Sequence, residues 1–262
     1  MKINCSGGKG VMELQDCFAC ALEGENICGY DYALIKEMMS DQDKEERRNS
    51  IHVTDLTGCL RRAYYDKKEP AAEYIHETLA RWLGTNFHHA AENQDELFDS
   101  ELLLSHNGIV GRSDLVYKNG RIVDYKFVRW MYVDRLPYGS HALQLNIYGY
   151  MLRKQGRPVT RLQVQYVDAS GPTKCKKCKV PVRMYEGELK CPNCFQYIPN
   201  AHLGAYLCDI PIMSDEEVEA NILHRKEELE ASLALGMPPA REPGYLCAYC
   251  AHAQKCCPDM DE

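Results

Sequence analysis

Two acids and a lysine lie close together on one segment, GRSDLVYKNGRIVDYK. If residues 118–120 form a three-residue loop with Gly120 in the left-handed conformation, Asp114 lies directly opposite Asp124 on paired strands. Lys126 then points to the same face, because side chains alternate along a strand. Two opposed carboxylates repel each other unless a divalent cation, a shared proton or the lysine offsets their charge. Magnesium or manganese suits such oxygen ligands best.

Two other interpretations of this segment contain no metal site. A ladder of salt bridges on an exposed hairpin face would need no cation. A two-residue turn at Asn119 and Gly120 would shift the register by one residue and put the acids on opposite faces, because a one-residue slip reverses every side chain. The geometry of the loop therefore decides whether a site exists.

The surrounding sequence predicts the elements that must hold this hairpin. The turn signals HNG and KNG separate three β-type runs, so we expect a meander of three strands. Apolar residues at helical spacing predict helices on both sides of the meander, and a capped helix of about six turns follows a Cys-rich insert. The expected helices cover about residues 71–97, 140–156 and 214–236, and the expected strands cover residues 101–106, 108–118, 120–128, 161–169 and 201–211.

This order of elements, with an Asp followed about ten residues later by an acid-x-Lys, resembles the PD-(D/E)XK nuclease core. The second acid here is Asp124, where close relatives usually have Glu. The resemblance implies an α/β fold of the restriction-endonuclease-like class, with a mixed sheet flanked by helices. It also implies hydrolysis of phosphodiester bonds, with Asp114, Asp124 and Lys126 as catalytic residues.

A histidine on the helix before the strands extends the resemblance. The run from Gly84 to His88 is similar to the Gly-x3-His motif of RecB-type nucleases, in which the histidine is a metal ligand. The resemblance thus implies a metal site of His88, Asp114, Asp124 and the carbonyl of Tyr125. His89 is an alternative ligand, Glu92 could support the ligand from one turn later, and a plain surface histidine is the competing interpretation.

The helix after the strands carries a second matching motif. Gln144 and Tyr148 resemble the Gln-x3-Tyr motif of the same nucleases, and their i, i+4 spacing places both on one helical face. The resemblance implies that they hold a DNA strand or the catalytic lysine.

The insert contains the clearest metal motif among the 14 cysteines of the chain. Two Cys-x2-Cys pairs are separated by about the length of a short hairpin, which is the spacing of a zinc ribbon. The four expected zinc ligands are Cys175, Cys178, Cys191 and Cys194.

Cysteines near the C-terminus match a different pattern when they are combined with Cys59. They are similar to the split iron-sulfur signature of the CRISPR-associated RecB-like exonucleases, which implies a [4Fe-4S] cluster held by Cys59, Cys247, Cys250 and Cys256. Cys257 could replace Cys256. A zinc site with the same ligands is an alternative, because spacing alone does not choose the metal.

A third four-thiolate zinc site is expected near the N-terminus. Its ligands would be Cys5, Cys17, Cys20 and Cys28, with free thiols or a metal shared with another segment as the alternatives. Cys208 lies in an apolar strand and is expected in the core.

The net charge of −7 argues against a surface coated with basic residues. Binding to DNA would therefore need a local path of cations and aromatic rings. The candidates are Arg61, Arg62, Tyr64, Tyr65, Arg81, Trp82, Arg129 and Trp130. No apolar stretch is long enough to span a membrane, and the N-terminus has no apolar signal region, so a cytoplasmic protein is expected.

The sequence thus predicts a metal-dependent DNA exonuclease or endonuclease with four segments: residues 1–50, 51–169, 170–200 and 201–262. The family resemblance implies single-stranded or end-opened DNA as substrate. It also implies trimming of prespacers in CRISPR adaptation, with the adaptation integrase as partner; processing of phage DNA or of DNA under repair, with other partners, is equally open. The alternative is a zinc-rich adaptor that binds nucleic acid or protein on a nuclease fold without catalysis.

Overall fold

The computed structural model describes residues 2–5, 7–22, 28–39, 49–74, 78–79, 82–84, 96–128 and 131–256. Contacts divide the chain into two compact units. The first unit combines Met1–His89 with Ala220–Glu262, and the second is Ala90–Glu219. This division cuts across the four segments expected from the sequence, which stay predictions.

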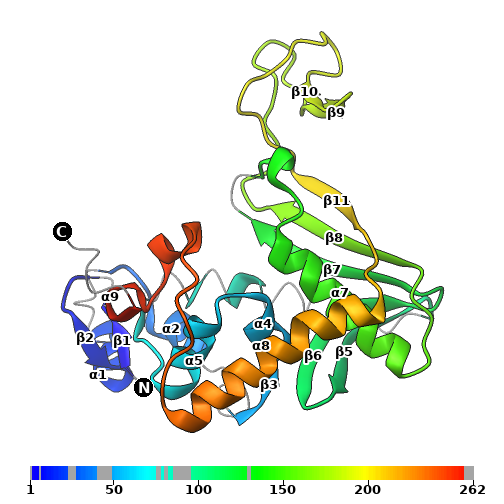
Figure 1. Ribbon diagram of the computed structural model, residues 1–262. Helices are drawn as coiled ribbons and strands as arrows, with labels where there is room; N and C mark the ends of the chain where they lie inside the picture. The colour runs from blue at the N-terminus through cyan, green and yellow to red at the C-terminus, as the bar shows by residue number, and fades with distance from the viewer. Residues whose placement is uncertain are drawn as a thin grey trace. The chain divides into compact units, whose positions relative to one another are not determined.

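The second unit is built on a mixed sheet (Figure 1). Its strands lie in the order β11-β8-β7-β6-β5, in which β7 and β8 are parallel and the other neighbours are antiparallel. The strands are β5 (Phe98–His106), β6 (Ile109–Tyr117), β7 (Arg121–Val128), β8 (Arg161–Asp168) and β11 (Ala205–Ile210). The predicted meander is therefore confirmed as β5, β6 and β7.

Two tight loops set the register of the meander. The β5–β6 loop consists of Asn107 and Gly108, both with positive φ, as the twist of a two-residue hairpin requires. The β6–β7 loop ends at Gly120, whose φ is +86°. A Cβ atom at Gly120 would lie 2.8 Å from the Pro158 carbonyl oxygen, so only glycine fits.

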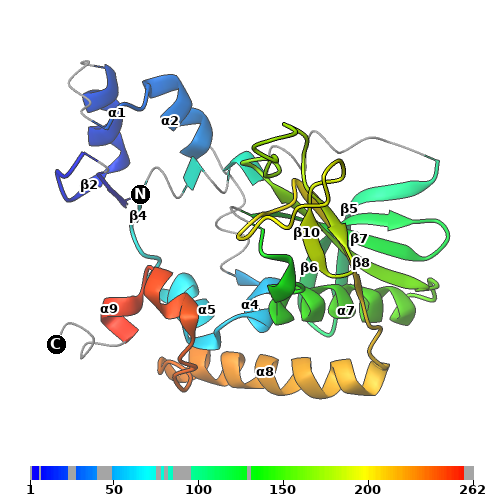
Figure 2. The ribbon, with the colours of Figure 1, turned by 90° about the horizontal axis from the view of Figure 1, so that it is seen from above.

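Helix α7 (Gly139–Lys154) packs against β5, β7 and β8 (Figure 2). All residues from Gln144 to Leu152 are buried, so burial is not confined to one face of the helix. It ends at Lys154 with Gln155 as the C-cap, and Gly156 takes the positive φ that commonly follows a helix C-terminus. A one-turn 3₁₀ helix, η1 (Val133–Arg135), precedes it.

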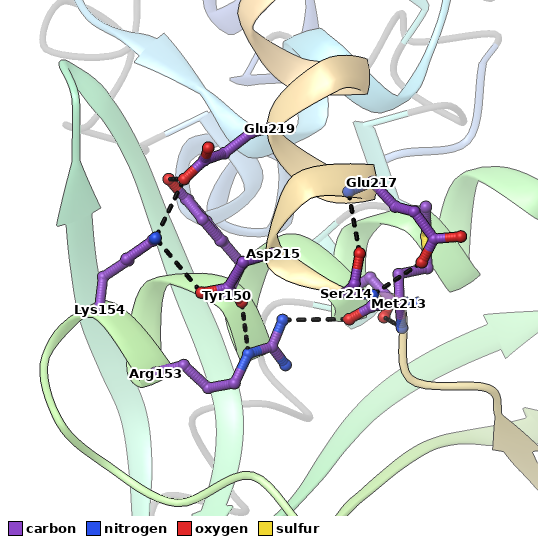
Figure 3. Close-up of polar contacts among 9 residues, drawn as sticks. Tyr150, Arg153, Lys154, Met213, Ser214, Asp215, Glu217 and Glu219 are labelled. Carbon is purple, nitrogen blue, oxygen red and sulfur yellow. Dashed lines mark hydrogen bonds and ion pairs between the residues drawn. The ribbon is translucent and has the colours of Figure 1, made fainter.

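The first turn of α8 (Asp215–Leu235) is fastened to α7 by ion pairs (Figure 3). Arg153 Nε lies 2.7 Å from Asp215 Oδ1, and the Tyr150 hydroxyl donates to Glu219 Oε1 at 2.8 Å. Ser214 and Glu217 form the reciprocal hydrogen bonds of a capping box. The expected capped helix is confirmed.

The Cys-rich insert contains a two-stranded hairpin of β9 (Arg183–Tyr185) and β10 (Glu188–Lys190). The chain enters the insert from the end of β8 and returns into β11 (Figure 1). Asp168, the last residue of β8, is buried and accepts a hydrogen bond from the Met131 amide.

The first unit holds short strands and several helices. The strands β1 (Lys2–Asn4), β2 (Val11–Glu13) and β4 (Glu73–Tyr74) form a small sheet in the order β2-β1-β4. Ile3, Ile35 and Met38 are among the residues of its apolar core. The other elements are α1 (Leu14–Leu22), α2 (Tyr32–Met39), β3 (Ile51–His52), α4 (Val53–Thr57), α5 (Leu60–Lys68), η2 (Tyr245–Tyr249) and α9 (Ala253–Cys256).

The helix expected over about residues 71–97 is wrong at its start, because Glu73 and Tyr74 form β4. These two residues pair in parallel with β1, a partner that lies about seventy residues earlier in the sequence. Residues 78–79 and 82–84 are helical. In the part of the chain that the structure describes, no helix combines the length and the apolar character needed to cross a membrane.

Candidate active site and cysteine clusters

The register of the β6–β7 hairpin is the one that the three-residue loop predicts. The paired residues are Leu115 with Val123 and Val116 with Ile122. The Gly120 amide donates to the Tyr117 carbonyl at 2.9 Å, and the Arg121 guanidinium lies 3.8 Å from the centre of the Tyr117 ring. Continued by one residue beyond the Leu115–Val123 pair, the same register places Asp114 across from Asp124. The two-residue turn is therefore wrong.

The two carboxylates and the lysine share one face of this hairpin. Asp124 is 1% exposed, and its Oδ2 atom lies 2.7 Å from Nζ of Lys126. The Tyr125 amide donates to Asp114 Oδ2 at 2.6 Å, so the Asp114 carboxylate reaches the backbone next to Asp124. A ladder of surface salt bridges is excluded, because Asp124 is buried. Burying a charged carboxylate is costly unless compensating charges surround it.

Helix α7 places two polar side chains beside the carboxylates. Gln144 and Tyr148 are buried, and Gln144 Nε2 donates to the Tyr148 hydroxyl at 2.9 Å. Burial and the neighbouring charge of Asp124 raise the pKa of Tyr148 well above its usual value. Gln144 and Tyr148 therefore lie on one helical face, as predicted. Tyr148 is close enough to Asp124 for the carboxylate charge to raise the pKa of its hydroxyl.

Glu101 is a third carboxylate at this site that the sequence analysis missed. Ladder pairs on either side of it join Ser100 with Leu115 and Leu102 with Ser113. Glu101 therefore lies across from Asp114, with a positive φ of 49° that interrupts regular strand geometry. Arg112 Nη1 lies 3.8 Å from Glu101 Oε2. The signal was the two-residue loop of Asn107 and Gly108, which fixes this register from the sequence alone.

A polar group beside Lys126 was also missed. In the parallel β7–β8 ladder, Lys126 pairs with Tyr166. The Tyr166 hydroxyl lies 3.0 Å from Nδ1 of His141 and accepts a hydrogen bond from the Tyr138 amide at 3.3 Å. Burial and the positive charge of Lys126 lower the pKa of His141 to about 4. His141 is therefore neutral near pH 7 and can exchange a hydrogen bond with Tyr166.

Several predicted residues lie outside the described part of the chain. They are His88, His89 and Glu92 on the expected metal-binding helix, Arg81, Arg129 and Trp130 on the expected DNA path, and Cys257. Their roles stay predictions.

The four cysteines of the insert converge. The sulfur atoms of Cys175, Cys178, Cys191 and Cys194 all lie within 4.8 Å of one another, the only such group of possible metal ligands among the described residues. Burial opposes ionisation of Cys191, but hydrogen bonds from the Cys194 and Asn193 amides lower its pKa to about 6. Thiolates gathered in this way suit a tetrahedral metal ion. The arrangement therefore supports the expected zinc ribbon.

The C-terminal tail is attached to the helix that begins after Cys59. His252 Nε2 lies 2.7 Å from Asp66 Oδ1, although the two residues are 186 positions apart in the sequence. Lys255 forms an ion pair with Glu69, the residue that follows α5. The four thiolates of a [4Fe-4S] cluster lie farther apart than those that bind a single metal ion. The cluster of Cys59, Cys247, Cys250 and Cys256 stays a prediction.

The N-terminal cysteines also lie near one another. Burial and the nearby thiols of Cys28, Cys5 and Cys20 raise the pKa of Cys17 to about 11. Lys9 Nζ donates to the Cys20 sulfur at 3.3 Å. Unlike the sulfur atoms of the insert cysteines, these four do not all lie within 4.8 Å of one another. The third zinc site therefore stays a prediction. Cys208 is buried, as expected.

Two of the predicted DNA-binding residues on α5 are engaged in packing. Tyr65 is 6% exposed, and its ring centre lies 5.3 Å from that of His252. Arg61 donates to the Pro239 carbonyl at 2.8 Å, while Arg62 forms an i, i+4 ion pair with Asp66 at 3.5 Å. The contacts of Tyr65 and Arg61 join α5 to the C-terminal segment. Binding of DNA by these residues stays a prediction.

Two solved structures and one protein family are similar to this chain. The solved structure entitled "Crystal structure of SSO0001" is similar to the chain with a TM-score of 0.50 and 19% identity, covering 84% of this chain and 92% of that one. An alkaline exonuclease from Laribacter hongkongensis is more distant, with a TM-score of 0.39, 11% identity, and coverage of 73% of this chain and 93% of that one. No curated protein matches the sequence significantly. The family profile described as the PD-(D/E)XK nuclease superfamily matches residues 95–258, which contain the hairpin, α7, the insert and the tail. With its mixed sheet, flanking helices and paired acids, the chain belongs to this superfamily.

Proposed function

We propose that this protein is a metal-dependent deoxyribonuclease that hydrolyses phosphodiester bonds in single-stranded or end-opened DNA. The observation that carries the proposal is the hairpin register, which sets Asp114 across from Asp124 with Lys126 Nζ 2.7 Å from a buried carboxylate oxygen. A purely structural hairpin gains nothing from burying a carboxylate opposite a second one. A site that binds cations and handles phosphate does.

The donor set of this site fits a hard divalent cation. Asp114 and Asp124 provide carboxylate oxygens, and the Tyr125 carbonyl and His88 would complete the set for one or two Mg²⁺ or Mn²⁺ ions. Such an ion supplies charge neutralisation at the scissile phosphate and makes the attacking water more acidic. Glu101 lies across from Asp114 and would add a third carboxylate at the edge of the site.

The other residues position the reacting groups. The Lys126 ammonium is held against Asp124, where it would stabilise negative charge that develops on the phosphate or assist deprotonation of water. The Tyr148 hydroxyl keeps its proton, because burial and Asp124 raise its pKa. Gln144 holds that hydroxyl in place, so Tyr148 can donate a hydrogen bond to a DNA strand.

The decisive experiment follows cleavage of end-labelled single-stranded DNA by anaerobically purified protein with Mn²⁺. Lys126→Ala should abolish cleavage while the protein stays folded, because the charge opposite the phosphate is lost. Chelation of the divalent cation should do the same. The position of the label in the products reports the polarity of cleavage.

Lys118→Ala is the matched control. Lys118 lies on the same hairpin, is half exposed and pairs with Asp99 away from the acids, so its loss should leave cleavage intact. Cleavage that survives both Lys126→Ala and chelation would overturn the mechanism. No cleavage by folded, metal-loaded wild-type protein would instead favour the non-catalytic adaptor.

We further propose that Cys59, Cys247, Cys250 and Cys256 hold a [4Fe-4S] cluster and that the insert cysteines hold zinc. The attachment of the tail to α5 supports the cluster, since it joins the two distant segments that carry the expected ligands. Loading of both metals and an exonuclease activity would place the protein in DNA end processing. Prespacer trimming beside a CRISPR integrase, or processing of phage or damaged DNA, are the settings to be tested.

A further inference from the structure

The zinc ribbon contains two equivalent turns that carry unusual residues. In one, the Lys179 amide donates to the Cys175 carbonyl at 2.8 Å; in the other, the Phe195 amide donates to the Cys191 carbonyl at 2.9 Å. Lys179 and Phe195 both adopt the left-handed conformation, with φ of 58° and 54°. Glycine takes this conformation without steric cost, so glycine would suit both turns. Each turn nevertheless carries a side chain, that of Lys179 or Phe195, which the turn itself does not require.

Phe195 is only partly buried, so packing offsets little of this cost. A bulky residue with positive φ is an outlier, and strained residues of this kind concentrate at functional sites. Phe195 is 64% exposed, so little of its ring is removed from water. Its centre lies 5.7 Å from that of Tyr185, and Tyr197, two residues further on, is 54% exposed. The ribbon therefore presents aromatic rings to solvent.

The segment that carries these rings is also positively charged. Residues 170–200 contain six Lys and Arg and two Glu, in a chain whose net charge is −7. Five of the six cations are exposed, and in the described structure none of the five has a carboxylate partner. They are Lys174, Lys176, Lys177, Lys179 and Arg183. Even after the four thiolates and one zinc ion contribute about −2, the ribbon stays positive.

The chain enters and leaves the ribbon at the strand ends near the candidate active site. In the parallel ladder, Val128 pairs with Asp168, which is two residues beyond the pairing partner of Lys126. Asp168 accepts a hydrogen bond from the Met131 amide at 2.9 Å and lies 3.0 Å from Nδ1 of His202. The chain segments that lead into and out of the ribbon are therefore anchored at the same end of the sheet as the lysine.

We propose that the zinc ribbon is a second binding site for single-stranded DNA. Phe195 and Tyr197 stack on unpaired bases, and the lysines around the Cys175–Cys178 turn hold phosphates. Rings and flexible cations bind a strand without regard to its sequence, because every base has a stacking face and every nucleotide a phosphate. The inference rests on the proposed nuclease function for its choice of ligand, and it assigns a binding role to residues outside the catalytic hairpin.

The test measures binding separately from cleavage. The Lys126→Ala protein, loaded with zinc and free of added divalent cations, is titrated into a fluorescein-labelled polythymidine oligonucleotide, and anisotropy reports the affinity. Adding Phe195→Ala and Tyr197→Ala should weaken binding roughly tenfold or more, as loss of base stacking does. Lys176→Glu with Lys177→Glu should lower the slope of log affinity against log salt by about 1.4, if two phosphate contacts are lost.

Matched controls change the same kinds of residue elsewhere. Leu235→Ala with Met237→Ala removes two exposed apolar side chains, and Lys2→Glu with Lys36→Glu reverses two exposed charges; both should leave the affinity unchanged. Zinc content, measured for every variant, must match that of the parent protein. Unchanged affinity in the ribbon variants overturns the proposal and leaves protein docking as the role of the ribbon. Ribbon-dependent binding by a wild-type protein that cuts nothing upholds the ribbon site and overturns the nuclease.

Discussion

The β6–β7 hairpin and the C-terminal tail both gather candidate ligands, but they do so over very different distances in sequence. On the hairpin, Asp114 and Asp124 are ten residues apart, and one loop ending in Gly120 sets their register. In the tail, the expected ligands depend on contacts such as that of His252 with Asp66, which join segments 186 residues apart. The insert cysteines resemble the hairpin in this respect, because a short hairpin brings them together.

This difference predicts how each site depends on the rest of the molecule. Closing a long loop removes much conformational freedom, so a cross-link between distant segments stabilises the fold that contains them. A locally built site can be lost without loosening the remainder. The cluster ligands should therefore be coupled to the stability of the first unit, while the hairpin and the ribbon should not be.

The largest effect is expected from Cys59→Ser. Loss of a ligand should release the cluster, and the first unit should lose about 5 kcal/mol of stability, the value for a cross-link across a loop of more than a hundred residues. The iron content, the visible absorbance of the cluster and urea unfolding check this together.

Cys175→Ser is the matched change in the ribbon. It should lower the zinc content and leave the main urea transition in place, since the ribbon closes only a short loop. If the Cys59→Ser protein keeps its iron and unfolds at the same urea concentration as the wild type, the predicted coupling between the cluster ligands and the stability of the first unit is wrong.

The sequence predicted the elements that depend on local signals. The strands β5, β6 and β7 follow from their turn residues, and α8 follows from the capping residues Ser214 and Glu217. The prediction failed at β4, because Glu73 and Tyr74 pair with β1 and nothing local marks that distant partner. Helical spacing of apolar residues describes only the local chain.

The same distinction between local signals and distant partners applies to the residues of the candidate site. The positions of Asp114, Asp124 and Lys126 follow from one loop, and Gln144 and Tyr148 follow from helical spacing. To find Glu101 from the sequence, the register must also be extended from β6 to β5. The two-residue loop of Asn107 and Gly108 predicts that register. His141 and Tyr166 meet only because α7 packs on β8, which no sequence spacing reveals.

The second effect concerns pH and the sheet beside the hairpin. Burial and the charge of Lys126 lower the pKa of His141 to about 4, whereas an unfolded histidine titrates near 6.5. Between these values the unfolded chain binds more protons than the folded one, so stability falls as the pH falls, by up to about 3 kcal/mol for this residue. Urea unfolding of the second unit at about pH 7 and about pH 4.5 measures the loss.

His141→Gln should flatten this part of the stability profile, because the titrating group is gone. His224→Gln, on the exposed side of α8, is the control and should keep the wild-type slope. An unaltered slope in His141→Gln would mean that another group causes the acid sensitivity of the sheet.

The smallest effect is expected from His252→Ala, which tests the attachment of the tail without touching a cysteine. His252 is 4% exposed, and its ring packs on Tyr65, so its removal should cost the first unit about 2 kcal/mol. Asp66→Asn keeps the ring and replaces the half-exposed carboxylate that lies 2.7 Å from His252 Nε2, and it should cost less than about 1 kcal/mol. If both changes leave the urea transition of the first unit unchanged, contacts between distant segments add nothing to its stability, and the contrast with the hairpin disappears. If they lower it in the expected order, ring packing rather than charge holds the tail on α5.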